Sequence, residues 1–233
     1  MNFISVLSCL SLLLAVGVAQ YPKPCVMFRS FIKLAFISPF QMTGDGLISS
    51  TGLITYDALG QRMRVKNFGI GDNQDFALDQ LMLFREGVYY ESNWKTLSCK
   101  KMKLDSSFIP MQVPPDAKLM GQVFMGSSSS WGMGVLTNTW YGSLFTYNLY
   151  CMFSGFYSTV FTEIGCIPVS FTSYTPQSGW LTVSTFNWVI GTSNPMDYLP
   201  PDFCANSELE ETETPHNFFT VMESLAMKSK RIE

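Results

Sequence analysis

The chain has 233 residues, of which 47% are hydrophobic and only 14% charged, and its formal net charge is -3. This balance argues against a nucleic-acid-binding protein, because no basic stripe is available to neutralise phosphates. The length suits one large domain or two small ones, and the apolar content requires a sizeable core, an apolar surface or a cavity.

The first residues indicate secretion. Leu7 to Val16 form a short apolar stretch, and Gly17-Val18-Ala19 supplies the small residues that a signal peptidase needs. The apolar stretch is short for a membrane span, although a retained anchor is the alternative, and no later stretch is apolar for long enough. We therefore expect residues 1–19 to be a cleaved signal peptide and the protein to be soluble and extracellular, without a transmembrane segment.

The cysteines agree with secretion. Five follow the signal peptide, widely spaced and without a C-x-x-C pair. This spacing disfavours zinc binding and thioredoxin-type redox chemistry, and it favours structural disulfides. Because five is odd, at least one thiol is free, buried or paired between chains.

The middle of the chain predicts antiparallel strands. Residues 52–56 and 62–66 flank a turn-prone segment at 57–60, and the second run alternates charged and apolar residues, as a half-buried hairpin strand does. Three more runs continue this pattern as a meander, at 81–84, 88–91 and 96–104.

A proline-marked connection at 109–115 follows, because proline removes a hydrogen-bond donor from a sheet. Residues 126–130 form a flexible Gly-Ser loop within the domain. Longer strands, rich in aromatic and β-branched residues and separated by glycines, are predicted at 135–140, 144–153, 156–161, 167–174 and 178–191. The order of these elements predicts an all-β protein with two packed antiparallel sheets.

The composition changes after Cys204. An acidic run at 208–213 precedes apolar residues at helical spacing, and Pro215 suits a first helical turn. We expect residues 205–233 to form an acidic tail and a short amphipathic C-terminal helix. Its apolar face would dock on the sheet, on a dimer partner or on a lipid surface.

The sequence contains no recognisable catalytic motif. The single histidine, His216, lies in the tail, and no G-x-S-x-G, H-E-x-x-H or Walker loop is present. Carboxylates such as Glu163 lie in loop contexts that predict surface charge. We expect a protein that is not an enzyme, without catalytic residues or a cofactor. Calcium binding at Asp72, Asn73 and Asp75 is a further possibility, because these residues offer hard oxygen donors. Their spacing fits a plain turn as well.

Apolar side chains are the main functional signal. The chain has 19 Phe, 10 Tyr, 5 Trp and 14 Met. Methionine lets a cavity adapt to varied apolar shapes, and aromatic residues on strands can line a cleft between sheets. An ordinary β-sandwich core would explain the same composition, so the pattern alone does not distinguish a cleft from a core.

A set of short motifs occurs in fixed order over most of residues 25–204: Pro24-Cys25, Tyr56-Asp57, Gln61-Arg62-Met63-Arg64-Val65, Cys99-Lys100-Lys101-Met102, Ile109-Pro110, Thr139-Trp140-Tyr141-Gly142, Gly165-Cys166-Ile167-Pro168-Val169, and the segment from Phe186-Asn187 through Pro200-Pro201 to Cys204. Together these motifs resemble those of ependymin and the ependymin-related proteins. We therefore divide the chain into the signal peptide, an ependymin-like β domain at 20–204 and the tail.

The resemblance implies two antiparallel sheets that form a clam-like apolar cleft, similar to that of bacterial lipoprotein carriers, and assembly as a homodimer. It implies disulfides between Cys25 and Cys166 and between Cys99 and Cys204, which leaves Cys151 as a buried free thiol. It also implies binding of hydrophobic molecules, with calcium binding and cell–matrix adhesion as further family proposals.

From these implications we expect a secreted, non-enzymatic carrier of a fatty acid or lipid. The alternative is an extracellular matrix or cell-adhesion protein that binds other proteins. If a cleft forms, inward positions of its strands should line it, and the candidates are Leu83, Tyr90, Val135, Tyr147, Phe186 and Trp188.

Overall fold

The computed structural model describes residues 22–27, 31–41, 47–71, 74–105, 107–148, 151–175, 179–191 and 194–210. Within these ranges the chain is all-β, as predicted. The predicted signal peptide and C-terminal helix, and the Asp72-Asn73 pair, lie outside the described residues.

The strands are, in chain order, β1 (Phe31–Gln41), β2 (Leu47–Asp57), β3 (Arg62–Gly71), β4 (Gln74–Leu83), β5 (Val88–Asn93), β6 (Ser98–Lys103), β7 (Lys118–Gly126), β8 (Gly134–Asn148), β9 (Cys151–Thr162), β10 (Pro168–Thr175), β11 (Gly179–Ile190) and β12 (Leu209–Glu210). Two short 3-10 helices, η1 (Pro195–Tyr198) and η2 (Asp202–Cys204), precede β12.

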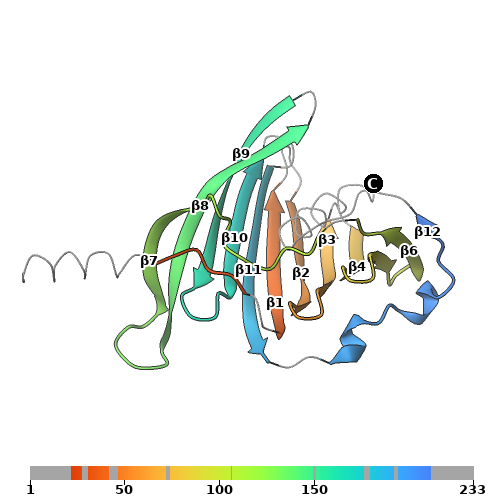
Figure 1. Cartoon of the computed structure of the whole chain (residues 1–233), viewed down its shortest axis with the longest axis horizontal. Coiled ribbons are helices and arrows are strands. Elements are labelled where there is room, and N and C mark those ends of the chain that lie inside the picture. Colours follow the sequence, from red (N-terminus) through yellow and green to blue (C-terminus); the bar gives the residue numbers. More distant parts are fainter. Residues whose placement is uncertain are drawn as a thin grey trace, which may run out of the picture.

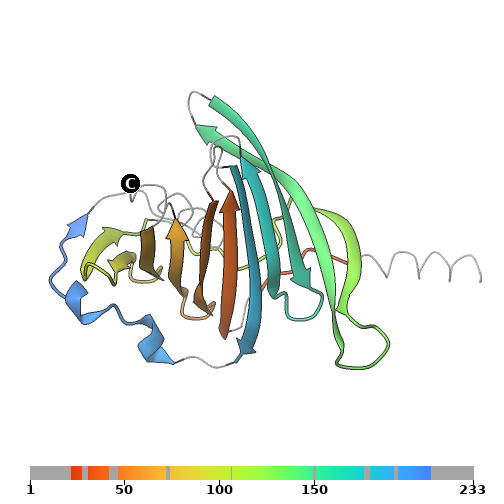
Figure 2. The same cartoon turned by 180° about the vertical axis from the view of Figure 1, so that it is seen from behind.

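These twelve strands form one continuous sheet in the order β12-β6-β5-β4-β3-β2-β1-β11-β10-β9-β8-β7. Neighbouring strands are antiparallel except β12 and β6, which are parallel. The meander β1 to β6 and the strands β7 to β11 are joined through the β1–β11 pair, so the two groups predicted as separate sheets are halves of one sheet. The sheet curves strongly, which gives it a concave inner face and a convex outer face (Figures 1 and 2).

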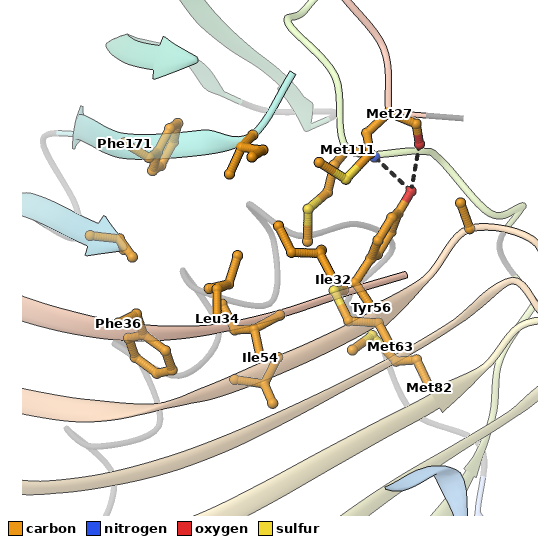
Figure 3. Close-up of a cluster of buried hydrophobic side chains, with 14 of the residues drawn as sticks. Met27, Ile32, Leu34, Phe36, Ile54, Tyr56, Met63, Met82, Met111 and Phe171 are labelled. Carbon is orange, nitrogen blue, oxygen red and sulfur yellow. Dashed lines mark hydrogen bonds between the residues drawn. The ribbon is translucent and has the colours of Figure 1, made fainter. Parts of the chain in front are cut away.

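The main hydrophobic core lies on the inner face. Alternate residues of the strands β1 to β11 contribute to it, as Ile32, Leu34 and Phe36 do on β1. The segment 22–27 and the described residues of 104–117 pack on these side chains, and an isolated bridge between Val26 and Gln112 links the two segments. Figure 3 shows Met27 and Met111 above the strand residues of this core.

Tyr56 attaches both covering segments to the sheet. Its hydroxyl accepts a hydrogen bond from the Met111 backbone N–H at 3.1 Å and lies 3.3 Å from the Met27 carbonyl oxygen, to which it donates (Figure 3). Burial raises the pKa of the Tyr56 hydroxyl to about 12, with a further contribution from the Asp57 carboxylate and an opposing one from the Met111 hydrogen bond.

Three inner-face glycines each face an aromatic residue across a strand pair. The register pairs are Phe36 with Gly52, Phe76 with Gly69, and Tyr157 with Gly142. At each glycine, a Cβ atom would overlap the partner ring; the distance to Phe36 Cε1 would be only 2.7 Å at Gly52. The rings therefore occupy the space that a side chain would fill, an arrangement that accommodates sheet curvature.

Two predicted strand boundaries are wrong. We expected a break at Gly142 between strands 135–140 and 144–153, but β8 continues through this glycine because Tyr157 covers it. Strand β9 likewise continues through Gly155. Strands β1, β7 and β12 were not predicted.

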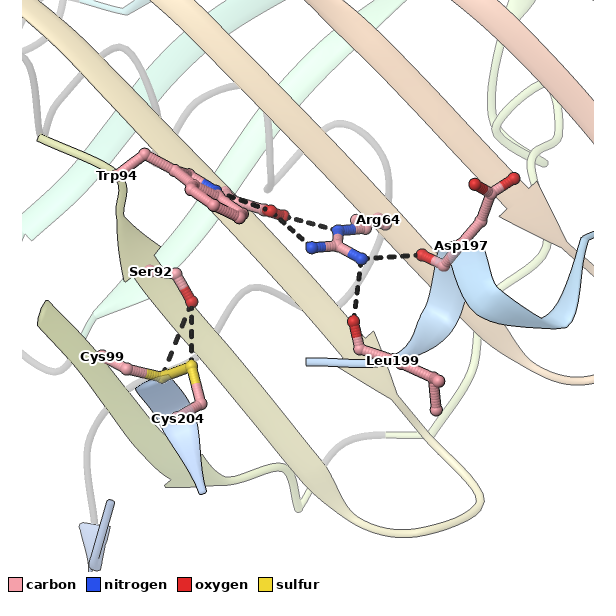
Figure 4. A network of polar contacts seen from close by, with 8 residues as sticks. Arg64, Ser92, Trp94, Cys99, Asp197, Leu199 and Cys204 are labelled. Atoms are coloured by element: carbon pink, nitrogen blue, oxygen red, sulfur yellow. Dashed lines mark hydrogen bonds and ion pairs between the residues drawn. A yellow bond between two sulfur atoms is a disulfide. The ribbon is translucent and has the colours of Figure 1, made fainter. Parts of the chain in front are cut away.

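The segment 195–204 packs on the outer face of the meander, held by polar contacts (Figure 4). Arg64 donates two hydrogen bonds to the Asp79 carboxylate, at 2.8 and 2.6 Å, and its remaining Nη1 donates to the carbonyl oxygens of Asp197 and Leu199 at 3.0 and 2.9 Å. The Trp94 indole N–H also donates to Asp79, at 3.1 Å. The guanidinium of Arg64 thus fixes the C-terminal segment to the sheet.

Two disulfides join distant parts of the fold. Cys25 pairs with Cys166 and Cys99 with Cys204, which are the pairs that the family resemblance implies. The first connects an inner covering segment to the β9–β10 connection, and the second ties η2 to β6. The side chain of Cys151 is outside the described part of the structure.

Candidate functional site

An apolar pocket of about 480 Å³ lies between the β7–β8 hairpin and the β9–β10 turn. This volume is within the range of about 300–1,000 Å³ that is common for small-molecule sites. Its lining residues are Phe124, Ser127, Ser128, Ser130, Trp131, Gly132, Gly134, Val135, Leu136 and Ile164. Large apolar side chains form the walls, and the serines come from the hairpin loop.

The hairpin geometry places the walls side by side. Phe124 on β7 is the register partner of Leu136 on β8, and Gly126 pairs with Gly134 at the start of the loop. The loop is closed by a hydrogen bond from the Ser127 N–H to the Met133 carbonyl oxygen at 2.9 Å. Gly126 has a φ of 104° and a Cβ there would overlap the Met133 carbonyl oxygen, so this turn requires glycine.

A polar group lies at the side of the hairpin. Gln122 donates to the Asn138 side-chain oxygen at 2.9 Å, and Asn138 donates to the Glu163 carboxylate. The Glu163 backbone N–H donates to the Leu136 carbonyl oxygen at 2.9 Å, which fixes the β9–β10 turn against β8. The sequence offered Glu163 as a candidate catalytic carboxylate. In the structure its carboxylate accepts hydrogen bonds from side-chain amides.

The described residues contain no cluster of side chains that could bind a metal ion. Within them, no three His, Cys, Asp or Glu side chains converge in a group that could hold an ion. Asp75 forms an exposed ion pair with Lys95 at 3.3 Å. Calcium coordination at the 72–75 loop stays a prediction, because Asp72 and Asn73 lie outside the described residues.

Five of the six side chains predicted to line a cleft lie in the described part of the structure, and these five do not line one common cleft. Val135 lines the pocket. Trp188 packs against the inner-face core and donates to Thr185 Oγ1 at 2.9 Å, whereas the half-buried Phe186 pairs with Ala35. Tyr147 pairs through its backbone with Met152, and its side chain lies outside the described part.

Leu83 and Tyr90 lie on the opposite face from the core. They pack with Leu81 and Tyr198 in a separate outer cluster, beneath η1. The reason is strand alternation: Met82 and Tyr89 take the inner positions, so their neighbours point outward.

Phe124, Trp131, Leu136 and Ile164 line the pocket but were not predicted. A signal was present, because the apolar run at 123–125 faces a second one at 135–136 across a Gly-Ser turn. Such a hairpin is apolar on both faces, so its strands lack the alternation of apolar and polar residues by which half-buried strands are predicted.

Membrane-spanning helices are not found in the part of the chain that the structure describes.

The fold and pocket define the class: an all-β, disulfide-linked protein with one open, curved sheet and an apolar pocket at its β7 end. Comparison with known proteins gives the family. The chain belongs to the ependymin family, whose family model, Ependymin, matches residues 72–204.

The relatives that the chain resembles are fish ependymins. It is 33% identical over 187 residues to Ependymin-2 of Oncorhynchus mykiss, covering 79% of this chain and 81% of the relative. It is 32% identical over 182 residues to Ependymin of Esox lucius, covering 77% and 78%. Among solved structures, an uncharacterized conserved protein from Thermus thermophilus aligns with a TM-score of 0.48 and 8% identity, over 88% of this chain and 99% of that one.

Proposed function

We propose that the protein is a secreted, non-enzymatic binder or carrier of hydrophobic molecules of the fatty-acid or lipid class. The observation that carries the proposal is the apolar pocket walled by Phe124, Val135, Leu136 and Ile164. The apolar start of the sequence and two disulfides support secretion.

The free energy of burial sets how much of an acyl chain the pocket has to cover. Burial of a methylene group contributes about 0.8 kcal/mol, so eight or so buried methylenes contribute roughly 6 kcal/mol before ordering costs are subtracted. The loop serines are positioned to interact with a polar end of the ligand, since three of them line the same pocket. Micromolar affinity corresponds to about 8 kcal/mol, so a ligand has to bury most of a long acyl chain, on the order of 15 methylenes, once ordering costs of about 4 kcal/mol or more are included.

Charge placed in the wall tests the pocket. We expect Val135→Asp to weaken binding of a fluorescent long-chain fatty acid by at least about tenfold, which corresponds to ~1.4 kcal/mol. Val189→Asp is the matched control, because Val189 is similarly exposed but lies on β11, away from the pocket. Native mass spectrometry of the purified protein should also show a co-purifying apolar molecule. Equal affinity in both variants, with no co-purifying molecule, would favour the matrix-adhesion alternative.

We also propose a homodimer formed through outer sheet faces. Phe156, Tyr174 and Trp180 are neighbours in register on β9, β10 and β11, and their rings contact one another with centroids 5.2–5.8 Å apart. Phe156 and Trp180 are exposed, so this aromatic row offers apolar surface to a second copy. A matrix protein is the alternative partner for the same row.

Sedimentation measurements separate the two partners. A dimer that dissociates in Trp180→Ser supports self-association through this row. A monomer at all concentrations, with matrix binding that depends on Trp180, would instead support adhesion.

A further inference from the structure

The β7–β8 hairpin belongs to a long uncharged part of the sequence. From Leu119 to Thr162 the chain contains no Asp, Glu, Lys, Arg or His. Exposed strands and loops of a protein in water normally carry charged side chains. The medium that this hairpin contacts is therefore expected to be less polar than bulk water.

Apolar side chains are exposed on both faces of the hairpin. The consecutive residues Val123, Phe124 and Met125 are 55%, 52% and 49% exposed, and consecutive strand residues point to opposite faces. A protein partner packed on one face would leave the other face in water. A medium that surrounds the hairpin would cover both.

The loop extends this apolar surface to the tip. Trp131 is fully exposed and Met133 largely so. The hydrogen bond from the Ser127 N–H to the Met133 carbonyl oxygen, and another from the Met133 N–H to the Ser130 carbonyl oxygen at 3.3 Å, give the loop a defined turn. Figures 1 and 2 show the tip reaching beyond the neighbouring β9–β10 turn at the β7 end of the sheet, so the tip can contact a flat surface at that end.

We propose that the tip of the β7–β8 hairpin docks on neutral lipid bilayers. Tryptophan suits the headgroup level because its ring is apolar and its N–H is polar. The side chains of Met125 and Met133 enter the upper acyl region beside Trp131. Insertion is shallow, because β7 is an edge strand whose free backbone groups need hydration and are costly in hydrocarbon.

The proposal goes beyond the ligand site, since docking does not require an occupied pocket. Met125 and Met133 do not line the pocket, so they allow the two properties to be measured separately. Docking of an uncharged tip should also be insensitive to salt, in contrast to electrostatic attachment to anionic lipid.

The test is co-sedimentation of the full secreted chain with phosphatidylcholine vesicles at low and high salt. We expect Trp131→Ser and Met125→Ser/Met133→Ser each to lower the partition coefficient by at least about tenfold, or ~1.4 kcal/mol. Leu97→Ser is the matched control, because it removes an exposed apolar side chain from the β5–β6 turn, near the other end of the sheet. The methionine variant should keep its fatty-acid affinity, which separates failure of docking from failure of the pocket.

Three results would overturn the proposal. The first is no vesicle binding by the unmodified chain. The second is binding that is equal in all the variants, or that requires anionic lipid and disappears in high salt. The third is loss of self-association, rather than of vesicle binding, in the tip variants, which would assign the hairpin to contact between copies of the chain.

Discussion

Arg64 on β3 and Asp79 on β4 form a buried ion pair with two parallel hydrogen bonds, and their side chains are only 7% and 1% exposed. The pair lies between the sheet and the C-terminal segment 195–204 and is also bonded to that segment. One contact therefore links the stability of the meander to the attachment of η1.

Removing one partner of this pair should be costly. We expect Arg64→Met to lower the free energy of unfolding by about 3–5 kcal/mol, because Asp79 remains buried without its counter-charge. Lys33→Met is the control: its ion pair with Asp197 is partly exposed, and its loss should cost less than about 1 kcal/mol. Urea unfolding measures both, and similar costs for the two variants would contradict the assigned role of Arg64.

A substitution at Gly52 tests whether the glycine–aromatic pairs stabilise the fold. We expect Gly52→Ala to destabilise the protein by at least about 1–3 kcal/mol, because the added methyl group overlaps Phe36 and the Lys66 carbonyl oxygen. Gly121→Ala, in the edge strand β7, has no atom within 4 Å of its added Cβ and should be neutral or slightly stabilising. Thermal unfolding of both variants gives the comparison; a neutral Gly52→Ala would show that the sheet relaxes freely.

The disulfide between Cys99 and Cys204 should control the segment 195–204. We expect Cys99→Ser/Cys204→Ser to lose about 2–4 kcal/mol of stability and to become sensitive to protease within residues 195–210. Cys25→Ser/Cys166→Ser should also lose stability but should keep that segment protected, because the Cys99–Cys204 bond to β6 remains beside the polar contacts to β3. Peptide mapping of limited digests locates the first cleavage. Early cleavage within residues 195–210 in both variants would contradict the prediction that the Cys99–Cys204 bond protects this segment.

Buried tyrosines predict a loss of stability at high pH. Burial raises the pKa of both Tyr56 and Tyr157 from 10.0 to about 12, and the nearby Asp116 carboxylate contributes at Tyr157. Because the folded state retains protons that the unfolded state releases, this stabilisation is complete below pH 10 and is lost as the pH rises toward 12. Tyr56→Phe should flatten the decline measured by urea unfolding, whereas Tyr141→Phe, which removes an exposed hydroxyl, should not.

The sequence predicted those parts of the fold whose local pattern was complete. The hairpin of β2 and β3 combined a turn at 57–60 with an alternating strand, and the structure places both strands there. It did not predict that the two groups of strands join, because the pairing of β1 with β11 depends on residues far apart in the sequence.

The candidate site was harder to predict because apolar residues cover both faces of several strands. Leu81, Met82 and Leu83 are all buried, since η1 covers the outer face while the core covers the inner one. Alternation alone cannot then tell which residue points inward. The family resemblance implied the disulfides, but it did not identify the β7–β8 pocket.

The position of β11 between β1 and β10 has a consequence for folding. The central pair β1–β11 joins a strand made before the meander to one made after β10, so the meander β1 to β6 can pair locally long before the middle of the sheet can close. Loop-closure entropy makes such distant pairing slow. The long free edge of β1 is therefore unpaired in the nascent chain until residues 179–190 arrive, and that edge is the surface most in need of protection from aggregation during synthesis.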